Sequence, residues 1–304
     1  MIIGVTGATG IIGKRVISRL KDWGNPIRIL TRKEISMPGI DVITGDLCNQ
    51  SALGKFLKGV NILFHCAGEI NDESRMFCVN VEGTQNLLEV ASKSGLQVLC
   101  QISSAGVIGL TNRSLVNEDT PCQPQNTYEK SKYLAEKQVM TGFPGCRVVV
   151  LRPTNVFDEE KPGFVYYALR NSFLDRFKKI IKGGESAHLI HAEDVAAAAI
   201  HSIKLAKEKP EVYFVSQDHD PINTISGIER LCRAIKSGAD FSKIKKNPHL
   251  PPSLPFLLRW YFGRQSNRGD VRYSSEKLLS AGFIFPVGLR EGVKRVVKKK
   301  MACL

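Results

Sequence analysis

A tyrosine and a lysine four positions apart, Tyr128 and Lys132, are the residues of this sequence best suited to move a proton. At this spacing on a helix, two side chains share one face. A phenol has a pKa of about 10 and is a poor base at neutral pH, but a nearby ammonium group stabilises the phenolate and lowers that pKa. Ser104 ends the apolar run VLCQISS and can orient a substrate oxygen. We therefore expect Tyr128 to exchange a proton with a substrate hydroxyl or carbonyl, assisted by Ser104 and Lys132.

A glycine-rich segment near residue 7 is typical of a dinucleotide-binding turn. It reads GATGIIG, directly follows the apolar run IIGVT, and directly precedes an amphipathic helical pattern. In such a turn Gly7 permits the tight bend, Gly10 lets the backbone approach a pyrophosphate, and Gly13 lets the helix pack closely on the strand. The free N–H groups of a helix start favour phosphate. The predicted pyrophosphate site comprises Gly7, Thr9, Gly10, Ile11, Ile12 and Gly13.

The residues at the ends of the next apolar runs bear on which nicotinamide cofactor fits. The second run ends in Thr31-Arg32-Lys33, without the acidic residue that binds an adenosine ribose. Arg32 suits a ribose 2′-phosphate, so we expect NADP, with NAD possible and with exposed strand-end charge as the alternative interpretation. Asp46 and Leu47 follow the third run, where the adenine edge would lie. We expect Cys66, Ala67 and Gly68 to pass beside the cofactor, and His65 to be structural.

Asn80 opens a helical segment, NVEGT, and allows two interpretations. It is either a helix N-cap or a residue that holds the cofactor or a water near the site.

Short apolar runs alternate with helical periodicity over the first half of the chain, which predicts an α/β, doubly wound parallel-sheet Rossmann fold. We expect residues 1–152 to form the dinucleotide-binding domain. Residues 153–304 are expected to form a smaller substrate-binding region, partly interleaved with the first. The predicted strands are 2–6, 27–31, 41–44, 61–66, 98–103, 147–151 and 211–216, and the later predicted helices are 195–206 after the possible cap Asp194, 222–235, 274–280 and 289–297.

The composition is that of an ordinary globular protein of 304 residues, with 43% hydrophobic and 24% charged residues. No apolar run reaches the ~18 residues that a membrane-spanning helix needs. The first predicted strand begins directly after Met1, so we expect a cytoplasmic protein. The eight cysteines form no CxxC pair, which favours buried reduced thiols over metal or disulfide roles and predicts no metal site.

The net charge of +14 is concentrated in residues 241–304, where 14 Lys and Arg face three acidic residues. Such a region can attract a phosphate-bearing substrate, an anionic membrane or nucleic acid, or can be a solvated basic face. We expect no nucleic-acid partner. The segment PFLLRWYF, residues 255–262, combines apolar and aromatic residues with Arg259. It indicates either a peripheral membrane contact or a lid helix packed on the substrate region.

Taken together, these motifs resemble the extended short-chain dehydrogenase/reductases, the NAD-dependent epimerase/dehydratase group. The likeness rests on TGATGIIG, GDL, FHCAG, NVEGT, ISSAGVIG, YEKSK, LRPTNVF and IHAEDVA, and covers almost the whole chain. The resemblance implies that Ser104, Tyr128 and Lys132 are the catalytic group, with Lys132 also at the nicotinamide ribose. It further implies that Pro153 lies at the cofactor and Asn155 at the substrate's diphosphate. It also implies a homodimer formed through helices near 74–93 and 126–140.

The sequence departs from the pattern of the nucleotide-sugar epimerases at several positions. Asn267 stands where those proteins have an arginine, although Arg268 or Arg264 can reach the same phosphate. Ile108 replaces a tyrosine, and Phe157-Asp158 replaces Tyr-Gly. The segment HLPPSLPFLLRWYFG is similar to the dihydroflavonol-reductase and 3β-hydroxysteroid-dehydrogenase branches. These departures make a reductase more plausible than a plain UDP-glucose 4-epimerase.

The predicted function is therefore an NAD(P)-dependent oxidoreductase or epimerase acting on a nucleoside-diphosphate sugar. Two alternatives remain open. The first is an NADP-dependent ketoreductase or a dehydrogenase of the 3β-hydroxysteroid or dihydroflavonol type. The second is a non-catalytic NADP-binding sensor.

Overall fold

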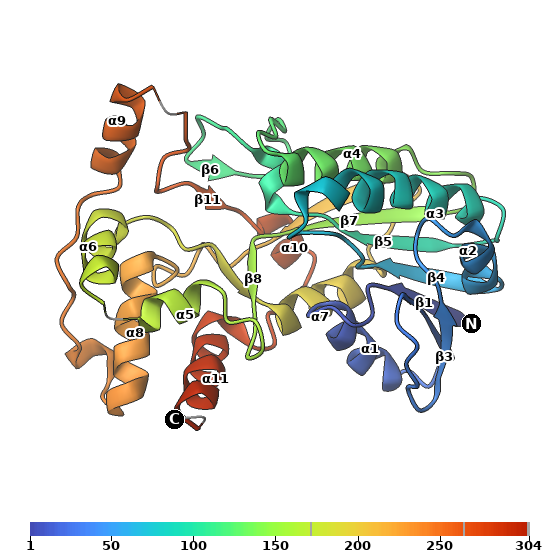
Figure 1. The fold of residues 1–304 in the computed structure, drawn as a ribbon, viewed down its shortest axis with the longest axis horizontal. Coiled ribbons are helices and arrows are strands. Elements are labelled where there is room, and N and C mark those ends of the chain that lie inside the picture. Colours follow the sequence, from blue (N-terminus) through green and yellow to red (C-terminus); the bar gives the residue numbers. More distant parts are fainter. Residues whose placement is uncertain (171, 264, 303–304) are drawn as a thin grey trace.

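A computed structural model of the protein describes residues 1–170, 172–263 and 265–302. At its centre is a seven-stranded sheet in the order β10-β7-β5-β4-β1-β2-β3, and each neighbouring pair is parallel (Figure 1). The order reverses at β1, as in a doubly wound fold, so the predicted fold class is confirmed. The strands are β1 (Ile2–Thr6), β2 (Ile27–Thr31), β3 (Ile40–Thr44), β4 (Val60–His65), β5 (Val98–Ile102), β7 (Arg147–Pro153) and β10 (Glu211–Val215).

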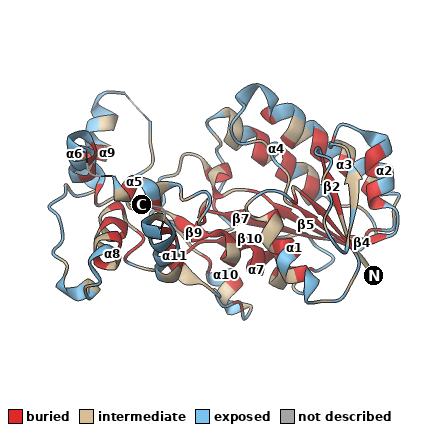
Figure 2. Cartoon of the chain, turned by 60° about the horizontal axis from the view of Figure 1, so that its bottom comes forward, coloured by how far each residue is buried: buried red, intermediate tan, exposed pale blue. Residues whose placement is uncertain are grey.

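Helices cover both faces of this sheet, which is why its strands are runs of valine, isoleucine and leucine without polar alternation. One face packs on α1 (Gly13–Lys21), α7 (Ala192–Ser202) and α10 (Glu276–Ser280). The other packs on α2 (Gln50–Leu57), α3 (Gly83–Ala91) and α4 (Thr127–Thr141). Figure 2 shows the buried layer running through the sheet and the inner sides of these helices.

The second half of the chain adds a smaller assembly beyond the carboxyl ends of the strands (Figure 1). It has its own core, which includes Phe157, Val165, Ile228 and Val293. Because β10 and α7 belong to the main sheet and its covering layer, the two halves of the sequence interleave; the boundary at residue 152 stays a prediction. The further elements are β6 (Leu115–Val116), β8 (Asn155–Phe157), α5 (Phe164–Leu169), α6 (Phe173–Lys182), β9 (Leu189–His191), α8 (Ile225–Ser237), α9 (Ser253–Tyr261), β11 (Arg272–Tyr273) and α11 (Gly288–Ala302).

The start of α7 differs from the prediction. The helix begins at Ala192, and the ring of His191 accepts the Glu193 N–H as its cap at 3.2 Å. Asp194 was expected to be the cap, but it lies inside the helix and is buried. Its carboxylate accepts the N–H groups of Val287 and Gly288 at 2.8 and 3.0 Å. Asp194 therefore accepts hydrogen bonds from a turn that lies far away in the sequence. Sequence periodicity does not reveal such a contact.

Several cysteines also differ from the expectation of burial. Cys100, Cys146 and Cys232 are buried, but Cys48 and Cys78 are exposed, and all cysteines of the described chain are free thiols. The exposed pair lies at the ends of elements, outside the apolar runs on which the expectation rested. Within the described ranges, no helix has both the length and the apolar character to cross a membrane.

Candidate active site

The glycine-rich turn follows β1 at the carboxyl edge of the sheet, where ligands bind in open α/β folds. Gly7 has φ of +66°, and a Cβ there would lie 2.6 Å from the backbone of Cys66 and Ala67. A Cβ on Gly13 would lie 2.2 Å from the Gly7 carbonyl oxygen. Both positions therefore require glycine for reasons of space, and Gly7 also requires it for backbone conformation.

The turn leaves backbone donors for an anion. The Gly10 N–H donates to the Gly7 carbonyl at 2.9 Å and closes the bend. In the described part of the chain, no acceptor lies against the N–H groups of Ile11 and Ile12, which precede the first residue of α1. A helix start with free N–H groups and room above glycine is what a pyrophosphate needs, so these residues fit the predicted dinucleotide.

Tyr128 and Lys132 lie in the first turns of α4, which is fixed by a capping box between Asn126 and Glu129. The Ser104 hydroxyl hydrogen-bonds the Tyr128 phenol and also accepts the Gly106 N–H at 3.0 Å. Lys132 is buried and donates from Nζ to the Ile102 carbonyl at 2.7 Å. The catalytic group that the sequence predicts is thus held where α4 meets the end of β5.

The predicted catalytic group is connected to the glycine turn through the loop after β4. Gly7 touches the backbone of Cys66 and Ala67, as described above. A Cβ on the next residue, Gly68, would lie 3.6 Å from Lys132 Nζ. The turn, the loop and Lys132 are therefore neighbours, and Tyr128 lies four residues before Lys132 on α4.

The acid–base properties differ in part from the expectation. Burial raises the pKa of Tyr128, the Ser104 hydrogen bond opposes this, and Glu129 adds to it. The lowering expected from Lys132 is not among these effects. Burial instead lowers the pKa of Lys132 itself, to about 8, against the opposing effects of Glu136 and Cys66. Lys132 directs its ammonium group at the Ile102 carbonyl of β5, and this is the physical reason that it does not lower the pKa of Tyr128.

Asn80 is not the helix N-cap that was one of its two interpretations. It lies within a short π-helical turn, Phe77–Glu82, and so is not an N-cap. Its amide accepts the Glu69 N–H at 2.7 Å and donates to the Glu69 carbonyl and the Ser131 hydroxyl at 3.0 Å each. Asn80 therefore clamps the loop that follows Gly68 onto α4, and a direct cofactor contact remains a prediction.

His65 is structural, as predicted. Its ring lies between the hydroxyls of Thr6 and Thr84, at 2.7 and 3.1 Å. Burial, together with Lys132, lowers its pKa to about 3, so the ring is neutral near pH 7.

A buried ion pair beneath the catalytic group was missed by the sequence reasoning. Glu136 accepts the Ser103 hydroxyl at 2.7 Å and pairs with Arg152 at 2.5 Å. All three side chains are buried. Glu136 lies four residues after Lys132 on α4, so the helical spacing that selected Tyr128 and Lys132 was the available signal.

The predicted cofactor residues at the adenosine end lie along the same edge of the sheet. Arg32 follows β2 and is exposed. Asp46 is exposed, and its carboxylate accepts the Cys48 N–H at 2.9 Å. The Leu47 side chain, in contrast, is buried in the core against Gly83. The predicted adenine would therefore have to contact the backbone of Leu47, because the side chain is buried.

The predicted substrate residues lie in the second half of the chain and are engaged to different degrees. Pro153 ends β7, and the Asn155 side chain donates to the Ala187 carbonyl at 2.9 Å. Arg268 is half-exposed and forms a two-fold pair with Asp270, at 3.0 and 2.8 Å. Asn267 binds the backbone of Gly109 and Thr111. Asn267 thus holds a loop, and the other cation considered, Arg264, lies outside the described residues.

A histidine with an unusual backbone lies beside these residues. His188 has φ of +55°, and its Nδ1–H donates to the Asp218 carboxylate at 2.6 Å. Its ring contacts the Tyr273 ring edge-on at 5.2 Å between centroids. Its carbonyl accepts the Asn155 N–H at 2.7 Å. Sequence reasoning gave no sign of this group, because its members come from three separate segments.

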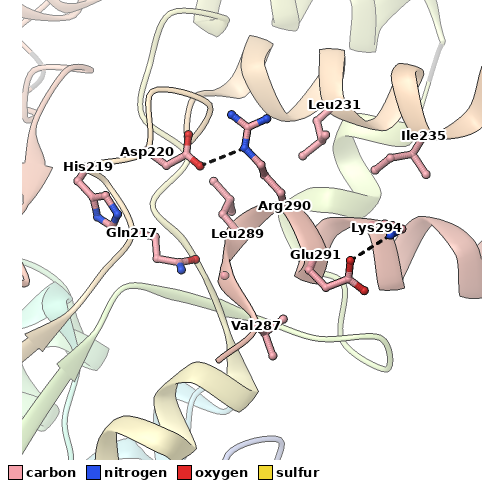
Figure 3. Close-up of a pocket in the computed structure, with 11 residues that line it drawn as sticks. Gln217, His219, Asp220, Leu231, Ile235, Val287, Leu289, Arg290, Glu291 and Lys294 are labelled. Atoms are coloured by element: carbon pink, nitrogen blue, oxygen red, sulfur yellow. Dashed lines mark hydrogen bonds and ion pairs between the residues drawn. The ribbon is translucent and has the colours of Figure 1, made fainter. Parts of the chain in front are cut away.

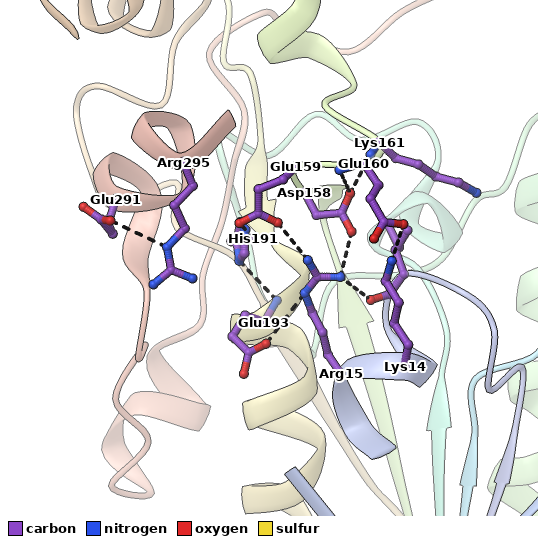
Figure 4. A network of polar contacts seen from close by, with 11 residues as sticks. Lys14, Arg15, Asp158, Glu159, Glu160, Lys161, His191, Glu193, Glu291 and Arg295 are labelled. Carbon is purple, nitrogen blue, oxygen red and sulfur yellow. Dashed lines mark hydrogen bonds and ion pairs between the residues drawn. The ribbon is translucent and has the colours of Figure 1, made fainter. Parts of the chain in front are cut away.

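The Phe157-Asp158 departure has a structural explanation, shown in Figure 4. Asp158 is fully buried and accepts Arg15 at 2.7 Å and the backbone N–H groups of Glu160 and Lys161. Although burial raises the pKa of Asp158, these bonds hold it below its ordinary value. Arg15 also binds Glu159 at 2.9 Å. The loop after β8 is thereby fastened onto α1, next to the glycine turn.

A cavity of about 490 Å³ lies elsewhere, between α8 and the start of α11 (Figure 3). Gln217, His219, Leu231 and Leu289 are among the residues that line it, and Arg290 is paired there with Asp220 at 3.7 Å. None of the predicted catalytic or cofactor residues lines it. This cavity is therefore separate from the glycine turn and from Tyr128 and Lys132.

Known proteins show the same combination of fold and motifs. The model of the NAD dependent epimerase/dehydratase family matches residues 3–216. Sterol demethylase protein B of Methylococcus capsulatus is 26% identical, over 91% of this chain and 88% of that protein. The N-acetyl-α-D-glucosaminyl-diphospho-ditrans,octacis-undecaprenol 4-epimerase of Escherichia coli O157:H7 is 27% identical, over 96% and 93%.

The solved structure of UDP-glucose 4-epimerase from Thermotoga maritima, with UDP-glucose, superposes with a TM-score of 0.72. It is 19% identical and covers 100% of this chain and 99% of that one, which shows that the fold is shared. The family match spans the glycine turn, the catalytic group and β10. This chain is therefore an enzyme of the extended short-chain dehydrogenase/reductase type and belongs to the NAD-dependent epimerase/dehydratase family.

Proposed function

We propose that this enzyme oxidises or epimerises a hydroxyl-bearing carbon, or reduces a carbonyl carbon, of a sugar attached to a diphosphate, with Tyr128 as the general acid and base. The observation that carries the proposal is the chain of close contacts from the glycine turn through the Cys66–Gly68 loop to Lys132, with Tyr128 and its Ser104 partner beside it. A dinucleotide pyrophosphate at the turn and a reacting carbon at Tyr128 would then lie on the same side of the sheet's carboxyl edge.

A bound nicotinamide dinucleotide supplies the acceptor or donor of the hydride. The protein's own residues hold and move the proton. Tyr128 takes the proton from a substrate hydroxyl at its phenolic oxygen, or returns it to a carbonyl. Ser104, already hydrogen-bonded to that phenol, holds the substrate oxygen beside it. Lys132 contributes positive charge at Gly68, where the ribose of the cofactor would lie.

The preferred cofactor is proposed to be NADP, within a family named for NAD. Arg32 supports this, since it is exposed at the end of β2 and a guanidinium matches a ribose phosphate. Arg32→Ala should lower the ratio of kcat/KM for NADP over NAD by about tenfold or more, the value of one charge-assisted contact. An unchanged ratio would contradict the preference for NADP.

The diphosphate-sugar substrate is supported by one curated relative, whose name describes an epimerase of a diphospho-linked sugar. A second candidate is an apolar ketone or sterol. It is favoured by the sterol relative, and by Asn267 and Arg268, which are both occupied by contacts within the protein. Turnover assays with UDP- and dTDP-sugars against 3-hydroxysteroids and apolar ketones separate the two candidates.

Tyr128→Phe tests the chemical role against a non-catalytic sensor. We expect turnover to fall about 10²- to 10⁴-fold while the Kd of the dinucleotide stays within about threefold, because the phenol acts only on the proton. Tyr133→Phe, on the same helix, is the matched control and should retain activity. Full activity of Tyr128→Phe would overturn the mechanism, and absence of turnover by the wild type on every substrate class would favour the sensor.

A further inference from the structure

Helix α6 buries charged side chains and exposes apolar ones. Its buried residues are the charged Asp175 and Lys179, while four large apolar side chains of the same helix face solvent. The exposed fractions are 83% for Phe173, 67% for Leu174, 56% for Phe177 and 41% for Ile180. A helix of a globular protein normally directs its apolar stripe at the core, so this stripe is available to something outside the chain.

Polar contacts hold α6 in this orientation. Lys179 donates from Nζ to the carbonyls of Ala168 and Arg170, at 3.0 and 2.6 Å. Asp175 caps the helix with Ser172 and pairs with Arg170 at 3.2 Å. These hydrogen bonds and the ion pair fix the orientation of α6, so they hold its apolar stripe facing outward.

Helix α9 presents a second apolar surface. Pro255 is its buried residue, and Leu257 and Leu258 are 53% and 48% exposed. Trp260, Tyr261 and Phe262, at its carboxyl end, are 71%, 77% and 72% exposed. The interpretation of this segment as a lid packed on the substrate region does not agree with such exposure.

The two helices are neighbours, and their exposed side chains are together called the α6–α9 face. The Leu250 N–H donates to the Ile180 carbonyl at 2.8 Å, and Arg259 pairs with Glu185 at 3.0 Å. Gly184, two residues after α6, is in contact with Pro252, the N-cap of α9. Figures 1 and 2 place this α6–α9 face at the end of the molecule remote from β3 and α2.

The exposed charges of α6 and of residues 243–262 have one sign. Residues 243–262 contain Lys243, Lys245, Lys246 and Arg259 and no acidic residue. The three lysines are exposed, as are Lys178 and Lys182 of α6. Exposed aromatic and aliphatic side chains bordered by lysines are the combination that binds anionic lipid surfaces, with apolar groups at the acyl boundary and cations at the headgroups.

We propose that the α6–α9 face docks the enzyme on an anionic lipid bilayer, with the aromatic side chains of Phe173, Phe177, Trp260, Tyr261 and Phe262 entering the interface. A bilayer fits this face better than a second copy of the chain, because two such faces would bring their lysines together. The inference goes beyond the proposed function and does not depend on its substrate. It places the enzyme beside substrates that reside in or on a membrane.

Tryptophan fluorescence tests the contact directly. The chain has two tryptophans, so Trp23→Phe leaves Trp260 as the sole emitter. Adding vesicles of phosphatidylglycerol and phosphatidylcholine should shift its emission to shorter wavelength, and brominated lipids should quench it. Phosphatidylcholine vesicles alone should give a smaller response. No shift and no quenching with the anionic vesicles would overturn the proposal.

Co-sedimentation of the full-length protein with the same vesicles gives the second measurement. Phe173→Ser/Trp260→Ser/Phe262→Ser should lower the vesicle partition coefficient at least tenfold. Ile284→Ser is the matched control, because Ile284 is 82% exposed on a different loop and should leave binding unchanged. Equal binding by the triple variant and the wild type would contradict the docking face.

Two further readouts separate docking from other effects. Circular dichroism and turnover of a water-soluble substrate should be the same for the triple variant and the wild type. If the triple substitution instead converts a dimer to a monomer and the wild type does not bind vesicles, the face is a self-association surface and the proposal is wrong.

Discussion

Among the effects on single residues, burial changes most the pKa values of the groups proposed to move the proton. Lys132 is buried with one hydrogen bond, to the Ile102 carbonyl, and its pKa falls to about 8. Burial also raises the pKa of Tyr128. The protein thus holds both groups away from their ordinary values before any ligand binds, as functional sites often do at a cost in stability.

Lys132→Met should therefore stabilise the cofactor-free protein while abolishing most turnover. The unfolded chain keeps this proton up to the ordinary pKa of 10.5, whereas the folded protein releases it near 8. The unfolded state binds more protons in that window, so the lysine's destabilising effect is full below pH 8 and fades as the pH rises towards 10.5.

After subtraction of the lost hydrogen bond, we expect the free energy of unfolding to rise by about 1–2 kcal/mol at pH 7. Urea unfolding of both proteins at several pH values measures this. The difference between variant and wild type should shrink from pH 8 to pH 10.5. A difference that does not vary with pH would show that the buried charge is not its cause.

At the scale of elements, the junction of β1 and α1 depends on missing side chains. Gly7 and Gly13 allow the strand, the turn and the helix to approach within distances that any Cβ would prevent. The free N–H groups at Ile11 and Ile12 point to the ligand site only because α1 starts so close to the strand end. The predicted cofactor binding and the packing of α1 on β1 therefore both require glycine at these positions.

Gly13→Ala should weaken both properties at once. The new Cβ would lie 2.2 Å from the Gly7 carbonyl oxygen, so the turn or the helix has to move. We expect a loss of about 2–4 kcal/mol in the free energy of unfolding, and a dinucleotide Kd raised at least tenfold, measured by denaturant titration and calorimetry.

Gly54→Ala in α2 is the matched control. Nothing lies within 4 Å of a Cβ at Gly54, and alanine favours a helix interior over glycine by about 1 kcal/mol. This variant should be slightly more stable and should bind dinucleotide normally. If Gly13→Ala behaves in the same way, the turn is not under the steric constraint argued above.

At the scale of the whole molecule, a polar cluster joins the substrate region to the dinucleotide half. Arg15 of α1 reaches Asp158 and Glu159 in the loop after β8 (Figure 4). Arg19 pairs with Glu193 at the start of α7. Because Asp158 is fully buried, its charge depends on this cluster. The two halves are therefore coupled next to the glycine turn.

Arg15→Met should remove this contact between the two halves of the molecule. A buried carboxylate that loses its cation costs about 3 kcal/mol or somewhat less here, since two backbone N–H groups remain on Asp158. We expect the thermal midpoint to fall and limited proteolysis to cut first within residues 158–163. Lys14→Met, which removes a more exposed pair with Glu160, is the control and should change stability by less than about 1 kcal/mol.

The homodimer through helices near residues 74–93 and 126–140 stays a prediction. Phe77 and Leu134 are 41% and 38% exposed on those segments and would be covered in such a dimer. Leu134→Lys should convert the dimer to a monomer in analytical ultracentrifugation, because a charge would be buried at the contact. A wild-type protein that sediments as a monomer at all accessible concentrations would contradict the dimer.

The sequence by itself determined the sheet, the glycine turn and the proposed catalytic group. Each depends on local rules: apolar runs for β1 to β5, β7 and β10, glycine spacing for the turn, and four-residue spacing for Tyr128 and Lys132. Tertiary structure decided the use of Asp194 on a distant turn, the clamp at Asn80 and the buried Glu136–Arg152 pair. It also decided that the apolar stripe of α6 faces outward. These features bring together residues far apart in the chain, and no periodicity records what a side chain will meet after folding.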